Sequence, residues 1–137
     1  MVVSYNMPEF IQNAKVKCCF IGIDMGKKNI GISFSDRSGK FAYPHSIIKN
    51  DVFKLSIIKS LCDELSVGSG VVGVPLSHFR NDNWIPTIEN FAKKLSNILG
   101  ISIFLQDESG TTYNNKDDIS ATVILQRALD IINNLYV

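Results

Sequence analysis

The segment VKCCFIGID, at 16–24, constrains the fold of this chain more than any other stretch. It is rich in β-branched and aromatic residues, and its apolar residues stand at successive positions instead of alternate ones. Such a run is typical of a central strand in a sheet whose two faces are both covered. We therefore expect a sheet with helices on both faces. The run ends on one carboxylate, Asp24, immediately before a glycine-containing turn.

After this strand, the sequence predicts two more strands and then an alternation of helices and strands. GKKN forms a turn, IGISFS alternates with a period of two, and a Ser-Gly turn leads to a short strand at 40–44. Periodicity then predicts a helix at 51–66, a strand at 70–75, a helix from 84 to a stop at Gly100, a strand at 101–106 and a helix at 117–135. The order β-β-β-α-β-α-β-α indicates an α/β fold with a mixed five-stranded sheet. Residues 1–15 show no sustained period and are expected to form an N-terminal arm before a single domain at 16–137.

The composition is close to that of an average globular protein and names no function. Hydrophobic residues make up 45% of the 137 residues, charged residues 20%, and the net charge is +1, which argues against a disordered or fibrous chain. No apolar run reaches the ~18 residues of a membrane helix. No secretory signal is visible, so we expect a cytoplasmic protein without membrane contacts. Cys18, Cys19 and Cys62 lack CxxC spacing and are expected to be reduced thiols in or near the core.

Acidic residues follow two of the predicted strands and begin the last helix. Asp24 ends the first strand, Asp107 and Glu108 follow the fifth, and Asp117 and Asp118 open the helix. Because parallel strands place their carboxyl ends at one edge of a sheet, these acids are expected to meet there. Gathered carboxylates repel one another, and oxygen ligands suit Mg²⁺ or Mn²⁺, two of which would serve phosphodiester hydrolysis. Under the alternative interpretation, each acid only caps or solvates the end of its own element.

Five stretches resemble, in order and spacing, the YqgF/RuvX family of Holliday-junction-resolvase-like proteins, which are described as pre-16S rRNA nucleases. They are GIDMGKKNIGISFSD, VVGVPL, FAKKLSNILGISIFLQDE, TT and ATVILQRALD, between about residues 18 and 134. The resemblance implies an RNase H-like fold and a hydrolase acting in ribosome biogenesis. It also implies that Asp24, Glu108 and Asp117 are the catalytic residues and hold Mg²⁺ or Mn²⁺. An ungapped match of the last helix favours Asp117, with Asp118 as the alternative.

The resemblance further implies a nucleic-acid substrate, either pre-rRNA or another structured RNA, with a DNA junction as the alternative. Lys28 matches a lysine that the family carries after DxG, and with Lys27 it suits a phosphate contact, although a solvated turn lysine would have the same pattern. Arg80 is a third candidate for contacting nucleic acid. It lies in LSHFRNDN, which departs from the family's turn. Ser109 replaces a family arginine, and the basic segment expected before the last acid is shortened to YNNK.

The sequence therefore leaves several functions to compare. The first is a metal-dependent nuclease that processes the 5′ end of pre-16S rRNA, as a monomer or homodimer. The second is a Holliday junction resolvase, which should be a two-fold dimer. The third is a module of impaired activity that binds nucleic acid without cutting it, because the arginine and the basic segment are missing. An ATP-handling protein of the actin-like type would need two lobes of this topology, and this chain supplies one.

Overall fold

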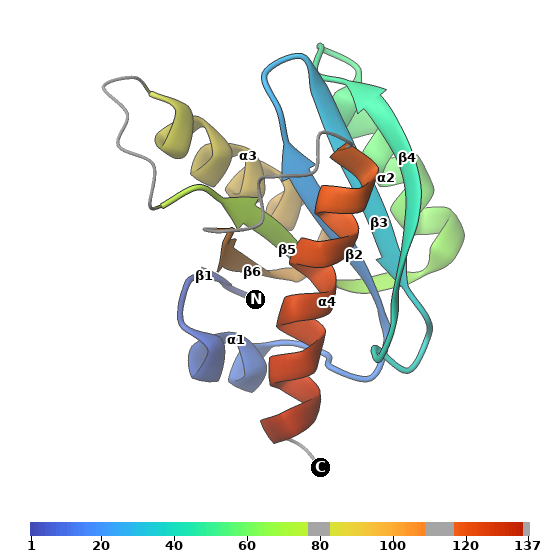
Figure 1. Ribbon diagram of the computed structural model, residues 1–137, viewed down its shortest axis with the longest axis vertical. Coiled ribbons are helices and arrows are strands. Elements are labelled where there is room, and N and C mark those ends of the chain that lie inside the picture. The colour runs from blue at the N-terminus through green and yellow to red at the C-terminus, as the bar shows by residue number, and fades with distance from the viewer. Residues whose placement is uncertain (77–82, 109–116, 136–137) are drawn as a thin grey trace.

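The computed structural model describes residues 1–76, 83–108 and 117–135, which form one mixed sheet and the helices around it (Figure 1). The strands are β1 (Val3–Ser4), β2 (Cys19–Met25), β3 (Asn29–Ser35), β4 (Ala42–Lys49), β5 (Val67–Val74) and β6 (Ser102–Asp107). The helices are α1 (Met7–Asn13), α2 (Lys54–Leu65), α3 (Trp84–Leu99) and α4 (Asp117–Leu135). The α/β class is confirmed. The strand count differs, since the described residues form a six-stranded sheet where five strands were expected.

The strand order places β2 in the middle of the sheet. In the described part of the chain the order is β1-β6-β5-β2-β3-β4. β2, β3 and β4 form the expected antiparallel meander, while β2, β5, β6 and β1 pair in parallel. Ile23 of β2 pairs with Ile32 of β3 on one side and Val72 of β5 on the other. The carboxyl ends of β2, β5 and β6 therefore share one edge of the sheet.

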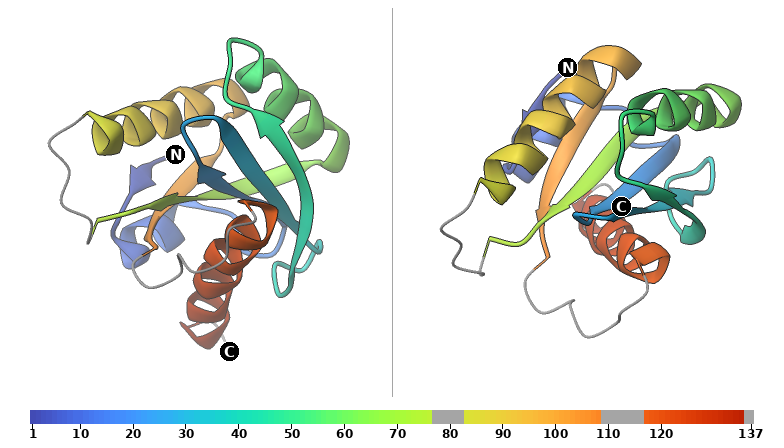
Figure 2. Two further views of the ribbon diagram at one scale, coloured as in Figure 1. Left: turned by 45° about the horizontal axis from the view of Figure 1, so that its top comes forward. Right: turned by 90° about the horizontal axis from the view of Figure 1, so that it is seen from above.

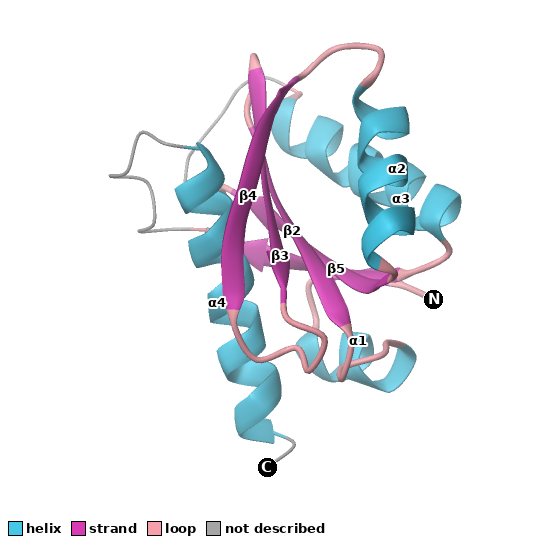
Figure 3. Ribbon diagram, turned by 90° about the vertical axis from the view of Figure 1, so that its right-hand side faces the viewer, coloured by secondary structure: helices cyan, strands magenta, loops and turns pink. Residues whose placement is uncertain are grey.

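Helices cover both faces of the sheet, as the apolar β2 segment predicts (Figure 3). α2 and α3 pack against one face, where Ile21, Ile23 and Met25 of β2 join their core. α1 and α4 pack against the other face, where Phe20 joins the core. Successive β2 side chains thus enter opposite cores, which accounts for a run whose apolar residues stand at successive positions.

Residues 1–15 are the main correction to the expected fold, because they contain β1 and α1 where an arm was expected. β1 extends the sheet by pairing in parallel with β6. Phe10 of α1 is fully buried, and its ring centroid lies 6.4 Å from that of Phe20 and 5.7 Å from that of Phe104. A strand of two residues and a helix of seven are too short to show a period; the signals for α1 in the sequence were those of a helix start, Asn6 as N-cap and Pro8 in the first turn.

Other elements also have bounds that differ from those expected, and β5 begins three residues earlier, at Val67. The strand expected at 40–44 continues to Lys49, because β4 is an edge strand in which Pro44 need not donate to a neighbour. The helix expected at 51–66 begins later, at Lys54. Asp51 still stabilises the turn that precedes α2, since the Asp51 carboxylate accepts a hydrogen bond from the backbone amide of Phe53 at 2.9 Å.

Candidate functional site

Asp24 lies one residue before the end of β2 and is half-buried. Side chains alternate along a strand, so Asp24 shares a face with Gly22 and Phe20. Phe20 belongs to the core that α1 and α4 cover, whereas Met25 belongs to the α2 and α3 core. Asp24 is therefore on the α4 face of the sheet, at the carboxyl edge.

Gly22 allows α4 to approach β2 closely below Asp24. A Cβ atom at this position would lie 2.6 Å from Cβ of Leu125 and 3.0 Å from the carbonyl oxygen of Ala121. Ser33, the β3 partner of Gly22, donates its hydroxyl to that same carbonyl at 2.9 Å. The contact fixes the height at which α4 crosses the sheet.

This contact places the first residue of α4 at the level of Asp24. Further along α4, Asn133 donates to the carbonyl of Gly39, near the start of β2, so α4 runs antiparallel to β2 (Figure 1). Asp117 is one turn before Ala121, a rise of ~6 Å. Asp24 is two residues past Gly22, a rise of ~7 Å. The backbone of Asp117 therefore reaches the same edge as Asp24, although the side chains of Asp117 and Asp118 are outside the described residues.

Glu108 follows β6 and places its carboxylate over β5. Its amide donates to the carbonyl of Val74 at 3.1 Å. Its Oε2 atom lies 2.8 Å from where a Cβ atom of Gly73 would be, and Ile124 of α4 lies beside the same point. Ile23 pairs with Val72, so Gly73 is level with Asp24 on the neighbouring strand, ~4.8 Å away. The Glu108 carboxylate, which reaches from the end of β6 over Gly73, therefore lies on the same face as Asp24.

Asp107 and Glu108 are separated by the direction of their side chains. Ile103 and Leu105 of β6 belong to the core beneath α2 and α3, and Asp107 continues their face. Glu108 is on the α4 face with Asp24. The structure thus brings Asp24, Glu108 and the start of α4 to one edge. No group of three or more His, Cys, Asp or Glu residues suited to a metal occurs within the described side chains, among which Asp117 is not included.

The turn after β2 carries the two lysines that the sequence associates with phosphate. Its backbone is held by a hydrogen bond from the amide of Gly26 to the carbonyl of Asn29 at 2.9 Å. A Cβ atom at Gly26 would lie 2.4 Å from that carbonyl oxygen, so glycine is required for close approach. Lys27 places its ammonium 5.6 Å from the ring centroid of Trp84 in α3, while Lys28 is exposed. Arg80 and Ser109 lie outside the described residues.

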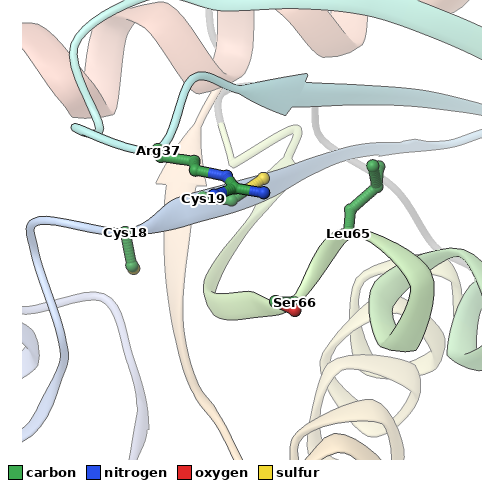
Figure 4. Close-up of a pocket in the computed structure, with 5 residues that line it drawn as sticks. All are labelled: Cys18, Cys19, Arg37, Leu65 and Ser66. Atoms are coloured by element: carbon green, nitrogen blue, oxygen red, sulfur yellow. The ribbon is translucent and has the colours of Figure 1, made fainter.

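A pocket of about 260 Å³ lies at the opposite end of β2, away from the acids. It is lined by Cys18, Cys19, Arg37, Leu65 and Ser66, and the two cysteines point to opposite sides of the strand (Figure 4). Burial raises the pKa of Cys18 and of Cys19. All three cysteines are free, as expected. Because the thiols of Cys18 and Cys19 stay protonated at neutral pH, the pocket offers no activated nucleophile.

Sequence reasoning missed a cleft between α2 and α3. The cleft has a volume of about 300 Å³ and lies on the face opposite Asp24. Its lining residues are Met25, Asn50, Lys54, Leu55, Thr87, Asn90, Phe91 and Lys94. The only signal in the sequence was Lys54 near the start of one amphipathic helix and Lys94 on another, a pattern that is common on solvated helix faces.

In the part of the chain that the structure describes, no helix is long and apolar enough to cross a membrane.

A match to a family model and similarity to curated relatives identify the family of this chain. Residues 18–116 match the family described as "RuvX: Holliday junction resolvase". The matched range includes Asp24 and Glu108 and ends one residue before Asp117.

Relatives with the name "Putative pre-16S rRNA nuclease" are similar over most of the chain. The protein from Wolbachia sp. subsp. Brugia malayi is 35% identical, over 91% of this chain and 94% of the relative. That from Ehrlichia chaffeensis is 33% identical, over 93% and 94%. The Wolbachia alignment spans 145 positions, more than the 137 residues of this chain, so it includes positions at which this chain has no residue.

Among solved structures, the chain is similar to T. thermophilus RuvC in complex with Holliday junction substrate. The TM-score is 0.59 at 9% sequence identity, covering 85% of this chain and 96% of the other. A second T. thermophilus RuvC structure gives a TM-score of 0.56 at 8% identity. At such identity the likeness shows the fold alone, and it confirms the expected RNase H-like class.

Proposed function

This chain belongs to the RuvX family, and from that premise we propose that it is a nuclease that hydrolyses phosphodiester bonds of pre-16S rRNA. One observation supports this proposal above the others. The carboxylate of Glu108 lies over Gly73, on the same face as Asp24 and at the edge where α4 begins. Two carboxylates and a helix start, brought together from distant parts of the chain, form an arrangement suited to phosphate chemistry.

The donor set fits divalent metal ions that prefer oxygen. We propose that Asp24, Glu108 and Asp117 hold Mg²⁺ or Mn²⁺, two ions being the expected number. The donors are carboxylates without histidine or cysteine, the ligand type that Mg²⁺ and Mn²⁺ prefer, and Asp24 and Glu108 are half-buried on one face, where two negative charges repel each other. Bound ions of this kind would activate a water molecule and stabilise the negative charge that develops on the leaving oxygen.

The residues of the chain itself would position these groups. Gly73 leaves room for the Glu108 carboxylate, and the hydrogen bond from the Glu108 amide to Val74 fixes the point at which the chain leaves β6. Lys28 is exposed on the turn after β2, and we propose that it contacts a phosphate of the substrate, with Lys27 beside it. We expect the protein to work in the cytoplasm, on RNA bound mainly through its phosphates and 2′-hydroxyls.

The proposal is tested with a labelled RNA that contains the 5′ leader of pre-16S rRNA, incubated with Mg²⁺ or Mn²⁺. The wild-type protein should cut the RNA, and Asp24→Asn and Glu108→Gln should abolish cutting while leaving the fold intact. Asp107→Asn is the matched control, because it neutralises the neighbouring acid, whose side chain is on the other face. Equal loss in Asp107→Asn and Glu108→Gln would contradict the assignment.

A Holliday junction resolvase is the second candidate, supported by the family's description. The same proteins would be incubated with a labelled four-way DNA junction, and their oligomeric state measured by analytical ultracentrifugation. Cutting of the junction by a dimer, with the RNA left whole, would favour the resolvase. Binding of RNA without cutting by any of the proteins would favour a module of impaired activity.

A further inference from the structure

The cleft between α2 and α3 begins one residue from Asp24, on the other face of the sheet. Met25 lines it, and Asn50, which also lines it, donates its side-chain amide to the carbonyl of Gly26 at 2.8 Å. The backbone amide of Asn50 also donates, to the carbonyl of Lys28 at 2.9 Å. The turn after β2 therefore forms a bridge between the acidic edge and the cleft, and it lies between α3 and the start of α2 (Figure 2, left).

The chemistry of the cleft favours an anion. Its lining includes Lys54 and Lys94, together with three neutral hydrogen-bonding side chains, and it includes no carboxylate. Within the described residues, the ammonium of Lys54 donates one hydrogen bond, to the backbone carbonyl of Asp51 at 3.2 Å, and an ammonium group has three donors. Lys94 forms no salt bridge with any described residue. Asp51, the nearest acid in sequence to Lys54, directs its carboxylate to the amide of Phe53.

Further lysines extend the positive charge from the cleft to the edge. Lys28 and Lys49 are exposed at the end of the β2–β4 meander, where Asn29 pairs with Lys49. Neither forms a salt bridge within the described residues. Lys27 lies over the ring of Trp84, at the start of α3. These cations surround the same turn, so the cleft and the turn form one positive surface next to the acids.

We propose that this surface binds the sugar-phosphate backbone of the substrate strand as it leaves the acidic edge. The strand would cross the turn at Lys27 and Lys28 and place phosphates against Lys54 and Lys94. This inference rests on the proposed nuclease function and adds where the substrate lies. Lysine ammonium groups bind phosphate as point charges and release condensed counterions, so the contact is independent of base sequence. The apolar floor formed by Met25, Leu55 and Phe91 leaves the polar groups at the rim, where a strand would pass.

The test measures binding separately from cutting, in the Asp24→Asn background. A fluorescently labelled single-stranded RNA is titrated with protein at several concentrations of KCl, and the slope of log K against log[salt] is obtained. The variant Lys54→Gln/Lys94→Gln should lose two phosphate contacts. Each contact contributes ~0.7 to the slope for a single strand, so the slope should fall by ~1.4. The affinity near ~0.1 M salt should fall about 25-fold.

The matched control is Lys59→Gln/Lys93→Gln, which removes the same charge from the same two helices. Lys59 pairs with Asp63 at 2.8 Å, and Lys93 lies beside Tyr5 and Glu89, away from the cleft. The control should keep the slope of the Asp24→Asn parent protein. Because Lys54 is half-buried, Lys94→Gln alone serves as a second variant, with an expected fall of ~0.7.

Each outcome decides between the two proposals. Equal slopes for the cleft variant and the control would overturn the proposal that the cleft binds the RNA backbone, even if the wild-type protein cuts RNA. A fall in slope for the cleft variant but not for the control, together with a wild-type protein that does not cut RNA, would support RNA binding in the cleft and overturn the proposed nuclease function. Absence of RNA binding by the parent protein would overturn both.

Discussion

Gly73→Ala tests whether the Glu108 carboxylate is held over β5 at the acidic edge. The new methyl group would lie 2.8 Å from Oε2 of Glu108 and 2.5 Å from Cδ1 of Ile124, and both are well inside ordinary contact distance. Ile124 is fully buried, so it can yield little, and overpacking of this kind costs about 1–3 kcal/mol. Glu108 is only half-buried and should move away.

The expected result is a modest loss of stability and a larger loss of activity. For a chain of this length, a loss of 1 kcal/mol corresponds to a fall of ~4 °C in Tm, so Tm should fall by roughly 4–12 °C. A displacement of ~1 Å in a positioned group costs about 100-fold in rate. We therefore expect metal-dependent cleavage to fall about 100-fold at a temperature where the variant remains folded, while RNA binding changes little.

Gly70→Ala is the matched control for this experiment. Gly70 lies in the same strand, and its new Cβ would meet Ile103 and Ile21 at 3.3 Å, on the face opposite Glu108. This variant should cut RNA at the wild-type rate. Full activity of Gly73→Ala, or the same loss in both variants, would refute the position that we assign to Glu108.

Three further predictions concern other parts of the fold. Ser66→Gly should raise the free energy of unfolding in urea by about 0.5–1 kcal/mol, because Ser66 ends α2 at φ 53°, a left-handed conformation that favours glycine, and Gly100→Ser at φ 68° should lower it. Phe10→Ala should lower that free energy by about 3–5 kcal/mol, with Gln12→Ala neutral, and a neutral Phe10→Ala would show that residues 1–15 are dispensable for stability. Burial tends to raise the pKa of Asp36, but hydrogen bonds from Phe41, Ser38 and Lys40 outweigh it and lower the pKa to about 2. Its contribution to stability should therefore be present above pH 3.8, the ordinary pKa, and disappear as the pH falls towards 2, and Asp36→Asn should weaken this acid dependence in urea titrations.

The sequence predicted elements whose pattern is carried by their own residues. The apolar run of β2 indicated a strand covered on both faces, and Ile21 and Phe20 do enter opposite cores. α3 shows its period in the sequence, begins with Pro86 in its first turn and ends at Gly100. These features are local, so one chain segment contains all the information needed to recognise them.

The sequence could not predict features that depend on register and packing between distant segments. The residue pattern alone did not separate Glu108 from Asp107, and only the family resemblance favoured Glu108; the physical difference is the face of the sheet to which each belongs, which follows from where β6 ends against β5. The level of Asp117 relative to Asp24 depends on the contact of Ala121 with Gly22 and Ser33. Lys54 and Lys94 are 40 residues apart, and nothing in either helix indicates that they line one cleft.

The two faces of β2 divide the proposed work of the protein. Asp24 and Met25 are adjacent in the chain, yet one is with the acids beneath α4 and the other lines the lysine-bearing cleft beneath α2 and α3. The carboxylates proposed to bind metal and the two cleft lysines proposed to bind phosphate, Lys54 and Lys94, are thus kept apart by the thickness of the sheet. Placed on one face, the lysines would pair with the carboxylates and compete with the metal ions. This separation also bears on Ser109, which stands where the family has an arginine: if the cleft binds the strand, Lys54 and Lys94 supply positive charge that the shortened segment does not.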